Sequence, residues 1–473
     1  MNTAYRMALI CSAALPILSA APACAQHMPG MHMSKPMRAP PPATPPGTPP
    51  ATNATPAPEP APAPAPSPAH DHGDMAMDMP GMEHGGMDHG AMGHVDPDSP
   101  AEGSGTSRLP ANGGGHHGLH LAAGDWQIMV HGFVSTQYTS DTGPRGDRKF
   151  YALSHLMVTA SHETGWGRLQ LRGIGSLEPL MRADGFPSLF TTGEVAFGQP
   201  LVDRQHPHDL IAELSAKVEV DLGTDTRGFV YGGPAAEPAL GPTVYLHRPS
   251  AKYNPEPPIT HHWFDSTHLS FGVITAGLAN RHFQLETSAF RGQEPDEHRF
   301  DIEAVRLDSW SVRATWNPSP EFALQASTGF LKQPEAAHSG ENEQRTTVSV
   351  HYANHDGLSA MVGYAVKHRL PGPALDAFLA EANWDIDRHN SFFGRIENVN
   401  NDELFSDPAS AFHDREFRVT KFQAGYARRY QIGPIELAAG GSVSAFAKPA
   451  LLDTAYGRHP MGYTGFVRLS LGH

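Results

Sequence analysis

The chain has almost no cysteine, and this bounds its chemistry. Its only two, Cys11 and Cys24, lie within the first 25 residues. Residues 1–25 have the features of a secretory signal, with an apolar run from Met7 to Ala20 and small residues before Gln26. Cleavage after residue 25 would leave no thiol, which excludes a disulfide framework and a cysteine metal site. Cleavage before Cys24 with acylation of that residue is the alternative, although the usual preceding leucine is missing.

Long apolar runs and excess positive charge are absent as well. No later segment approaches the roughly 20 apolar residues of a membrane-spanning helix. The formal net charge of −15 gives no support to nucleic-acid binding, and it suits cations and a hydrated acidic surface. A composition of 39 % hydrophobic and 8 % aromatic residues, with 47 Gly and 44 Pro, is lean for several α/β cores. It favours one large β structure with a disordered tail.

Alternation of apolar and polar residues is the strongest pattern in the chain. From Leu210 to Leu222 every second residue is apolar, and residues such as Glu213 and Lys217 lie between them, which predicts a two-faced strand. The pattern recurs at 128–138, 269–277, 310–316, 322–330, 358–366, 378–384, 435–445 and 463–471. Such segments after a signal peptide are typical of an outer-membrane barrel. We predict an all-β fold, an antiparallel outer-membrane β-barrel of about 16 strands over residues 125–473.

A soluble β-sandwich or propeller would produce the same alternation. The membrane is favoured because Glu381, Arg313 and Arg468 occupy the face opposite the aromatic one, as a hydrated lumen requires. Tyr, Trp and Phe also gather at the ends of the predicted strands, where aromatic girdles form. We therefore expect outer-membrane lipid to surround the barrel.

Residues 26–124 are predicted to form a disordered, low-complexity tail. A Pro- and Ala-rich spacer, Pro36–Pro68, separates two groups rich in methionine and histidine. Their candidate metal ligands are Met28, Met31, Met33, Met75, Met77, Met79, Met82, His84, Met87, His89, Met92 and His94. Thioether sulfur favours Cu(I) and imidazole suits Cu(II), so the tail is predicted to bind copper ions. The alternative is a solvated tail of biased composition without ligand function.

Two long segments, 177–209 and 232–266, interrupt the strand pattern, and loops of this length are usually functional or disordered. They hold most of a histidine-rich group whose candidate metal ligands are His206, His208, Asp209, His261, His262 and His268. An extended chain around Pro207 would direct His206 and His208 to one side. A shared ion also requires the chain to turn between His262 and His268, which lie about 20 Å apart in a straight strand.

We expect the two segments to fold over or into the lumen and to bring these histidines and His247 together. The metal that such a site would hold is not specified by the sequence. The alternative is a hydrogen-bonded plug in which Arg204, Arg248 and Asp265 form ion pairs and the histidines bond to carbonyl groups. Both interpretations stay open at this stage.

Several runs resemble a family of exported barrel proteins of Gram-negative bacteria. They are Gln199–Asp209, Glu237–Pro242, His247–Ser250, Asp265–His268 and Glu294–Glu297. Separately, the layout of a Met/His-rich tail followed by a barrel resembles copper resistance protein B. These resemblances imply an outer-membrane location, metal resistance or export, a tail in the periplasm and periplasmic copper-handling proteins as partners.

Catalysis is not expected. Ser266 lies beside Asp265 and close to His268, but residues so near in sequence seldom assemble a triad, and the chain has no Gly-x-Ser-x-Gly turn. Three functions therefore stay under consideration. They are a copper-binding resistance barrel, a porin-like channel with a non-essential tail and, as the least favoured, a membrane-embedded hydrolase.

Overall fold

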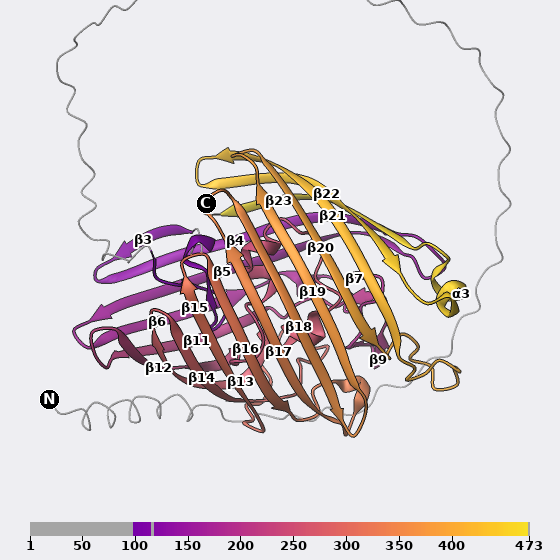
Figure 1. Cartoon of the computed structure of the whole chain (residues 1–473), viewed down its shortest axis with the longest axis horizontal. Helices are drawn as coiled ribbons and strands as arrows, with labels where there is room; N and C mark the ends of the chain where they lie inside the picture. The colour runs from indigo at the N-terminus through magenta and orange to yellow at the C-terminus, as the bar shows by residue number, and fades with distance from the viewer. Residues whose placement is uncertain (1–97, 115–117, 472–473) are drawn as a thin grey trace, which may run out of the picture. The chain divides into compact units, whose positions relative to one another are not determined.

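A computed structural model of the protein describes residues 98–114 and 118–471, and these form a closed antiparallel β-barrel of sixteen strands. The strands are β4 (Trp126–Asp141), β5 (Arg148–Thr164), β6 (Gly167–Gly175), β11 (Ile211–Asp221), β12 (Thr226–Ala236), β13 (Ser270–Asn280), β14 (Phe283–Phe290), β15 (Ser309–Ser319), β16 (Phe322–Leu331), β17 (Asn342–Ala353), β18 (Leu358–Leu370), β19 (Ala374–Asp385), β20 (Asn390–Asn401), β21 (Phe417–Ile432), β22 (Ile435–Ala447) and β23 (Met461–Leu471). Each strand pairs with the next, and β23 pairs with β4 to close the wall (Figure 1). The predicted fold class and strand number are confirmed.

The two faces of each strand differ as the alternation predicts. On β17, Val348 and Val350 are 48 % and 39 % exposed on the outer surface, whereas Thr347 and Ser349, which alternate with them, are buried inside. Since successive side chains of a strand point to opposite sides, the sheet presents an apolar exterior and a polar interior. Among the described residues, no helix combines the length and apolarity that a membrane crossing requires.

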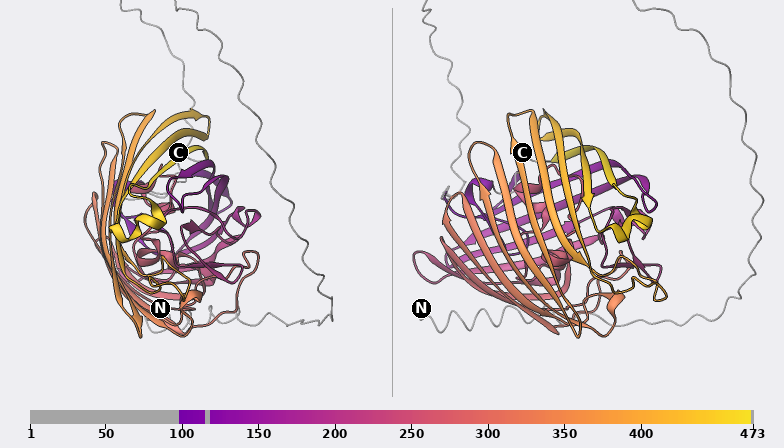
Figure 2. Two further views of the ribbon diagram at one scale, coloured as in Figure 1. Left: turned by 90° about the vertical axis from the view of Figure 1, so that its right-hand side faces the viewer. Right: turned by 45° about the vertical axis from the view of Figure 1, so that its right-hand side comes forward.

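The connections between strands differ at the two rims of the barrel (Figure 2). Short turns such as 281–282 and 320–321 lie at one rim. The long connections lie at the other, and we name three of them loop A (176–210), loop B (237–269) and loop C (291–308). Loop A holds η3 (Glu178–Leu180) and the short strands β7 (Phe186–Pro187), β8 (Glu194–Ala196), β9 (Gln199–Leu201) and β10 (Arg204–Gln205). Loop B holds η4 (Tyr245–His247), η5 (Pro249–Ala251), α2 (His261–Phe264) and η6 (Ser266–His268).

Loop B begins later than the sequence predicted. Residues 232–236 were expected in a loop because of their glycines and proline, but they continue β12 and pair with β13. A Cβ on Gly232 would lie 2.2 Å from the Val273 carbonyl oxygen, and one on Gly233 would lie 2.0 Å from that of Leu214. The two glycines therefore do not form a turn. They allow neighbouring strands to approach closely, next to a bulge in β11.

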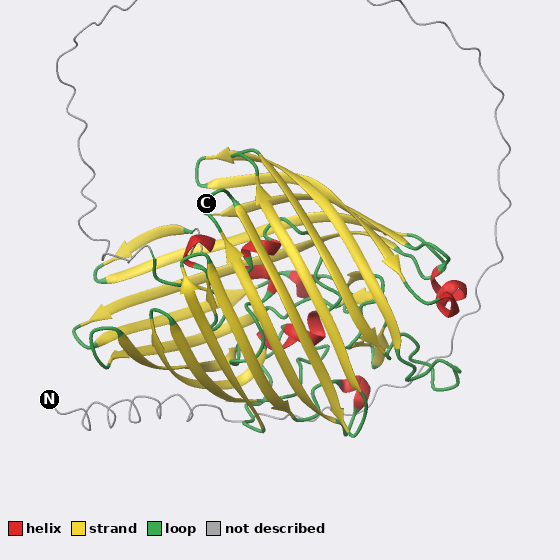
Figure 3. Ribbon diagram, viewed as in Figure 1, coloured by secondary structure: helices red, strands yellow, loops and turns green. Residues whose placement is uncertain are grey.

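Loops A and B fill the interior and pack on the inner face of the wall (Figure 3). Their buried apolar side chains include Phe190 from loop A and Trp263 and Phe264 from loop B, all at most 2 % exposed. They contact an apolar patch of the wall formed by Met361, Ala365, Leu375, Ala377, Leu379, Val399, Phe417 and Val419. Burial stabilises by about 1.5–3 kcal/mol for each large apolar side chain, so the loops are firmly docked.

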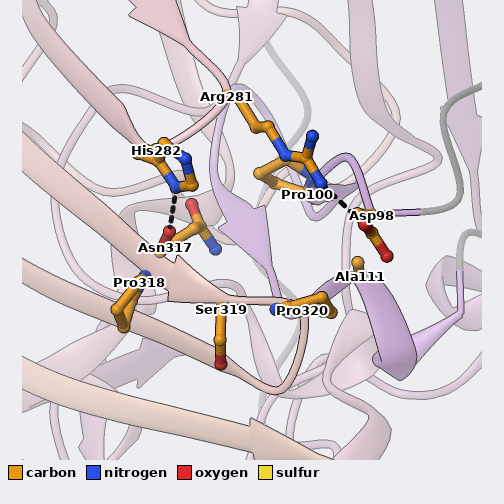
Figure 4. A pocket seen from close by; sticks show the side chains of 9 residues that line it. All are labelled: Asp98, Pro100, Ala111, Arg281, His282, Asn317, Pro318, Ser319 and Pro320. Carbon is orange, nitrogen blue, oxygen red and sulfur yellow. Dashed lines mark hydrogen bonds and ion pairs between the residues drawn. The ribbon is translucent and has the colours of Figure 1, made fainter.

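A hairpin ahead of the barrel enters the lumen from the short-turn rim. It comprises residues 98–114, with β1 (Ala101–Glu102), β2 (Arg108–Leu109) and η2 (Ala111–Gly113). At the rim, Arg281 donates a 2.7 Å hydrogen bond to Asp98, beside the turn Pro318–Pro320 (Figure 4). At its tip, Ser107 Oγ lies 2.7 Å from Thr243 Oγ1 of loop B.

The disordered tail was predicted to extend to residue 124, and this boundary is too late. Residues 98–114 form the hairpin, and β3 (Leu119–Ala123) pairs with the first residues of β4. The glycine- and serine-rich tip resembles a linker in composition, but its polar groups bond to the lumen. Thr106 Oγ1 donates to Glu286 of β14, and Arg172 of β6 donates to the Gly105 carbonyl oxygen at 3.0 Å.

Candidate functional site

The five histidines predicted from loops A and B converge inside the barrel. Ring centroids lie 6.2 Å apart for His206 and His208, 5.4 Å for His208 and His268, 5.2 Å for His268 and His261, and 5.5 Å for His261 and His262. The required turn is present, because α2 and η6 bend the chain between His262 and His268. We name this set the histidine cluster.

Carboxylates complete the cluster. Glu194 Oε1 of β8 lies 2.5 Å from His206 Nε2 and 3.1 Å from His262 Nε2, so it links loop A to loop B. Glu294 Oε1 of loop C lies 3.4 Å from the Nδ1 atom of His262. A Cβ on Gly193, whose φ is +103°, would lie 2.7 Å from that nitrogen, so the absent side chain makes room for the ring.

Four rings of the cluster have their Nδ1 atoms bound to oxygen acceptors. His206 Nδ1 lies 2.7 Å from the carbonyl oxygen of Pro207. His208 Nδ1 lies 2.8 Å from Glu178 Oε2, and His261 Nδ1 lies 2.7 Å from Asp265 Oδ1. His268 Nδ1 lies 2.9 Å from the carbonyl oxygen of Asp265. Because ionised carboxylates and carbonyls only accept, the Nδ1 atoms donate, and in the neutral rings Nε2 carries the lone pair.

The cluster surrounds a small cavity of about 20 Å³. Its lining includes Glu194, His206, His208, Asp209, His261, His268, Glu294 and Arg299. This volume is enough for one water molecule or one desolvated ion. His268 Nε2 is buried and has no hydrogen-bond partner among the described residues.

Charge in the cluster is unevenly compensated. Five carboxylates, those of Glu178, Glu194, Asp209, Asp265 and Glu294, surround the histidines, while Arg248 and Arg299 are the guanidinium groups paired with members of this set. With neutral imidazoles the site therefore has a net negative charge. Protons on histidine or a bound cation can offset it.

The histidines of the cluster differ in the direction in which their surroundings shift their pKa values. Burial lowers the pKa of His206 and, with repulsion from His261 and His208, holds the pKa of His268 well below its ordinary value. Burial also opposes charge on His262, but Glu294 and Glu194 raise its pKa well above the usual range. Glu178 likewise outweighs burial and raises the pKa of His208.

Two residues lie differently from what the sequence suggested. Asp209, a predicted ligand, accepts a 3.1 Å hydrogen bond from Arg299 Nη1. Burial raises its pKa to about 6. His247 lies against His155 of β5, with ring centroids 4.9 Å apart, rather than in the histidine cluster.

The ion pairs of the alternative plug interpretation are also present. Arg248 Nη1 lies 2.6 Å from Asp265 Oδ2, and its Nε lies 2.7 Å from Glu381 Oε1 of β19, with all three side chains buried. Ser266 Oγ accepts a 2.8 Å hydrogen bond from Arg345 Nη1 of β17. The histidine cluster is therefore part of a larger polar network that fixes the loops.

Sequence reasoning missed the carboxylates Glu178, Glu194 and Glu294. Glu294 lies in one of the runs that carried the family resemblance, which is the only signal that could have singled it out. The other two stand alone in loop A, at no spacing that suggests a ligand set. The predicted copper ligands from Met28 to His94 lie outside the described residues, so copper binding by the tail stays a prediction.

Glu237, at the start of loop B, makes docking of the hairpin pH-dependent. It faces Ser104 of the hairpin, Arg313, Glu213 and Asp265, and burial raises its pKa to about 8. The folded state therefore holds a proton that the unfolded state releases near the ordinary value. Its contribution to stability is full below the ordinary pKa of 4.5, falls as the pH rises above that value, and is lost by about pH 8.

We accordingly predict that amide hydrogen exchange in residues 98–114, corrected for its intrinsic pH dependence, becomes progressively faster as the pH rises towards 8 and levels off above that value. Glu237→Gln should make the protection nearly independent of pH between 5 and 9. A wild-type hairpin that is equally protected at pH 6 and pH 9 would contradict this assignment.

No protein-family model matches the chain, and no curated protein matches it in sequence. Solved structures of porins are similar in fold. They include OmpF of Salmonella typhi in complex with daunomycin (TM-score 0.49, 9 % identity, 75 % of this chain and 100 % of that one) and the anion-selective porin of Comamonas acidovorans (0.48, 11 %, 73 % and 100 %). OprB of Pseudomonas putida, in a high-pH structure, has a TM-score of 0.45 and 9 % identity, and the match covers 73 % of this chain and 94 % of that one. The barrel assignment rests on the strand pairing of the chain itself, and the resemblance to copper resistance protein B stays a prediction.

Proposed function

We propose that the protein is a porin-like channel of the outer membrane whose lumen is held closed by its own loops and hairpin. The apolar exterior supports insertion into lipid, and each of the sixteen wall strands described pairs with a neighbour on both sides. Outer-membrane barrels have short periplasmic turns and longer extracellular loops. On that rule the hairpin and the preceding tail lie on the periplasmic side, and loops A, B and C belong to the extracellular side.

The main support for a closed lumen is the burial of the inward-facing polar residues. Ser311 and Arg313 of β15 and Arg345 of β17 are 0 % exposed, and Glu397 of β20 is 0 % exposed as well. In a water-filled pore such side chains contact solvent. Here the two arginines and Glu397 bond to the hairpin and to loop B, so in this state the lumen is filled.

Planar-bilayer recording of the full-length chain tests the channel. We expect little steady conductance from the wild type and a large rise when residues 186–205 of loop A are replaced by a short glycine–serine linker. Shortening the largely exposed stretch 406–411 is the control and should change little. Wild-type conductance equal to that of the shortened variant would refute the closed lumen. A shortened barrel that folds but does not conduct would refute the channel.

Metal ions are the second candidate solute, and the histidine cluster favours them. Together with the Met/His-rich tail it would provide metal sites on the periplasmic side and within the lumen. Under this proposal the protein handles copper or a related metal in resistance or export and exchanges ions with periplasmic copper-handling proteins. Loss of the tail from intact cells treated with external protease would contradict the periplasmic placement.

A further inference from the structure

We propose that the cavity of the histidine cluster binds one divalent transition-metal ion of the borderline class, such as Zn²⁺ or Cu²⁺, through Nε2 of His208, His261 and His268. Imidazole nitrogen suits this class of ion. The ligands come from two loops, His208 from loop A and the other two from loop B. A bound ion therefore ties loop A to loop B.

The orientation of the three rings supports this assignment. Metal-binding histidines almost always donate their second ring N–H to a carboxylate, a backbone carbonyl or water. Glu178, Asp265 and the Asp265 carbonyl accept from the three Nδ1 atoms at 2.7–2.9 Å. These bonds fix the rings and leave Nε2 as the ligand atom.

The spacing agrees with one ion for two of the three ring pairs. The three ligand atoms must draw closer when the ion binds, because the groups whose ligand atoms lie within 4.8 Å of one another do not include this trio. With metal–nitrogen bonds of about 2.0–2.1 Å, two rings on a tetrahedral ion have centroids about 5 Å apart. The centroids of His208 and His261 lie 5.4 and 5.2 Å from that of His268, whose buried Nε2 has no hydrogen-bond partner among the described residues. Glu194 and Glu294 line the same cavity and offset the charge of the ion.

Two tighter groups in the described part of the chain are less suited to a metal. Glu194, His262 and Glu294 have ligand atoms within 4.8 Å of one another, but each nitrogen of His262 faces a carboxylate, which favours a charged imidazole there. The group Glu335, His338 and Glu403 already holds a cation, because Lys367 Nζ lies 2.7 Å from Glu335 and 3.4 Å from Glu403.

Zn²⁺ stoichiometry of the full-length chain tests the site. Replacing His27, His32, His70, His72, His84, His89 and His94 by alanine provides a background in which the histidines of residues 26–97 do not contribute. In it, the double variant His208→Ala, His268→Ala should lose one tightly bound Zn²⁺ per chain. His351→Ala, which removes a buried lumenal histidine of β17, is the matched control and should lose none.

The variant Glu178→Gln keeps all three imidazoles and covers the case in which the double variant does not fold. It weakens the partner of His208 Nδ1 and should lower the Zn²⁺ affinity by about 10–100-fold. Heat-dependent migration on gels reports whether each barrel is folded. Unchanged stoichiometry in a folded double variant, or unchanged affinity in Glu178→Gln, would overturn the site.

The tie between loops A and B has a consequence that rests on the proposed channel. Zn²⁺ should reduce residual wild-type conductance, a chelator should raise it, and neither should affect the double variant. Zn²⁺ that binds without changing conductance would overturn the gating role. A barrel that conducts in no variant would overturn the channel, while the stoichiometry would still decide the site.

Discussion

Arg248→Ala is expected to release loop B from the barrel wall and to open the lumen. The guanidinium group joins Asp265 of loop B to Glu381 of β19, and it also donates a 3.0 Å hydrogen bond to the Thr243 carbonyl oxygen. Removing one partner of a buried ion pair leaves an uncompensated buried charge and costs about 3–5 kcal/mol. Bilayer conductance should therefore increase, and chemical denaturation should show a destabilised barrel.

Glu381 retains Arg395 as a partner, at 2.9 Å, so the larger loss falls on Asp265. The control is Arg418→Ala. Arg418 pairs with Asp376 at 2.7 Å, but its side chain is 46 % exposed, and such pairs contribute about 0–1 kcal/mol. Equal effects of the two substitutions would contradict the role of Arg248 in closing the lumen.

Replacing Met75, Met77, Met79, Met82, Met87 and Met92 by leucine is expected to abolish most Cu(I) binding by the tail. Leucine has a similar volume but no sulfur, and the soft thioether is the ligand that favours Cu(I). Competition with a coloured Cu(I) chelator measures the loss. Undiminished binding would remove copper from the proposed function.

The histidines of the tail provide the matched experiment. Replacing His84, His89 and His94 by alanine should weaken Cu(II) binding and leave most Cu(I) binding in place. Acidification should have the same selectivity, because imidazole takes up a proton near its ordinary pKa of about 6.5, whereas a thioether does not. Cu(I) affinity that falls in parallel with Cu(II) affinity on acidification would contradict the assignment of ligands.

The sequence predicted the barrel wall because a strand with one buried and one lipid-facing side must alternate. Glu381 and Arg313 were correctly placed in the interior, at 3 % and 0 % exposed. The convergence of the histidine cluster was predicted from loop length and residue density. Its glutamate partners were not, since Glu178, Glu194 and Glu294 become neighbours only through the folding of loops A and C.

The filled lumen was harder to predict for a related reason. Leu375, Ala377 and Leu379 of β19 are buried beneath loops A and B, while Phe378 between them is 38 % exposed outside, so apolar residues occupy both faces there. Alternation cannot distinguish the two sides of such a stretch. The position of the hairpin tip was hard to predict as well. Its serines and glycines predict an exposed linker, and the lumenal groups that bond to the tip cannot be identified from the sequence.

The seam between β4 and β23 determines which strand edges are exposed during assembly. It joins residues far apart in sequence, as in the hydrogen bond from Thr136 to the Val467 carbonyl oxygen, 331 positions away, so its closure has a large entropic cost. Before closure both strands are open edges on which another chain can pair. Within the described residues the pairing of β23 with β4 reaches Gly132, and β3 pairs with β4 at 126–130. The pairing of β3 with β4 therefore protects this end of β4 against aggregation both before and after the barrel has closed.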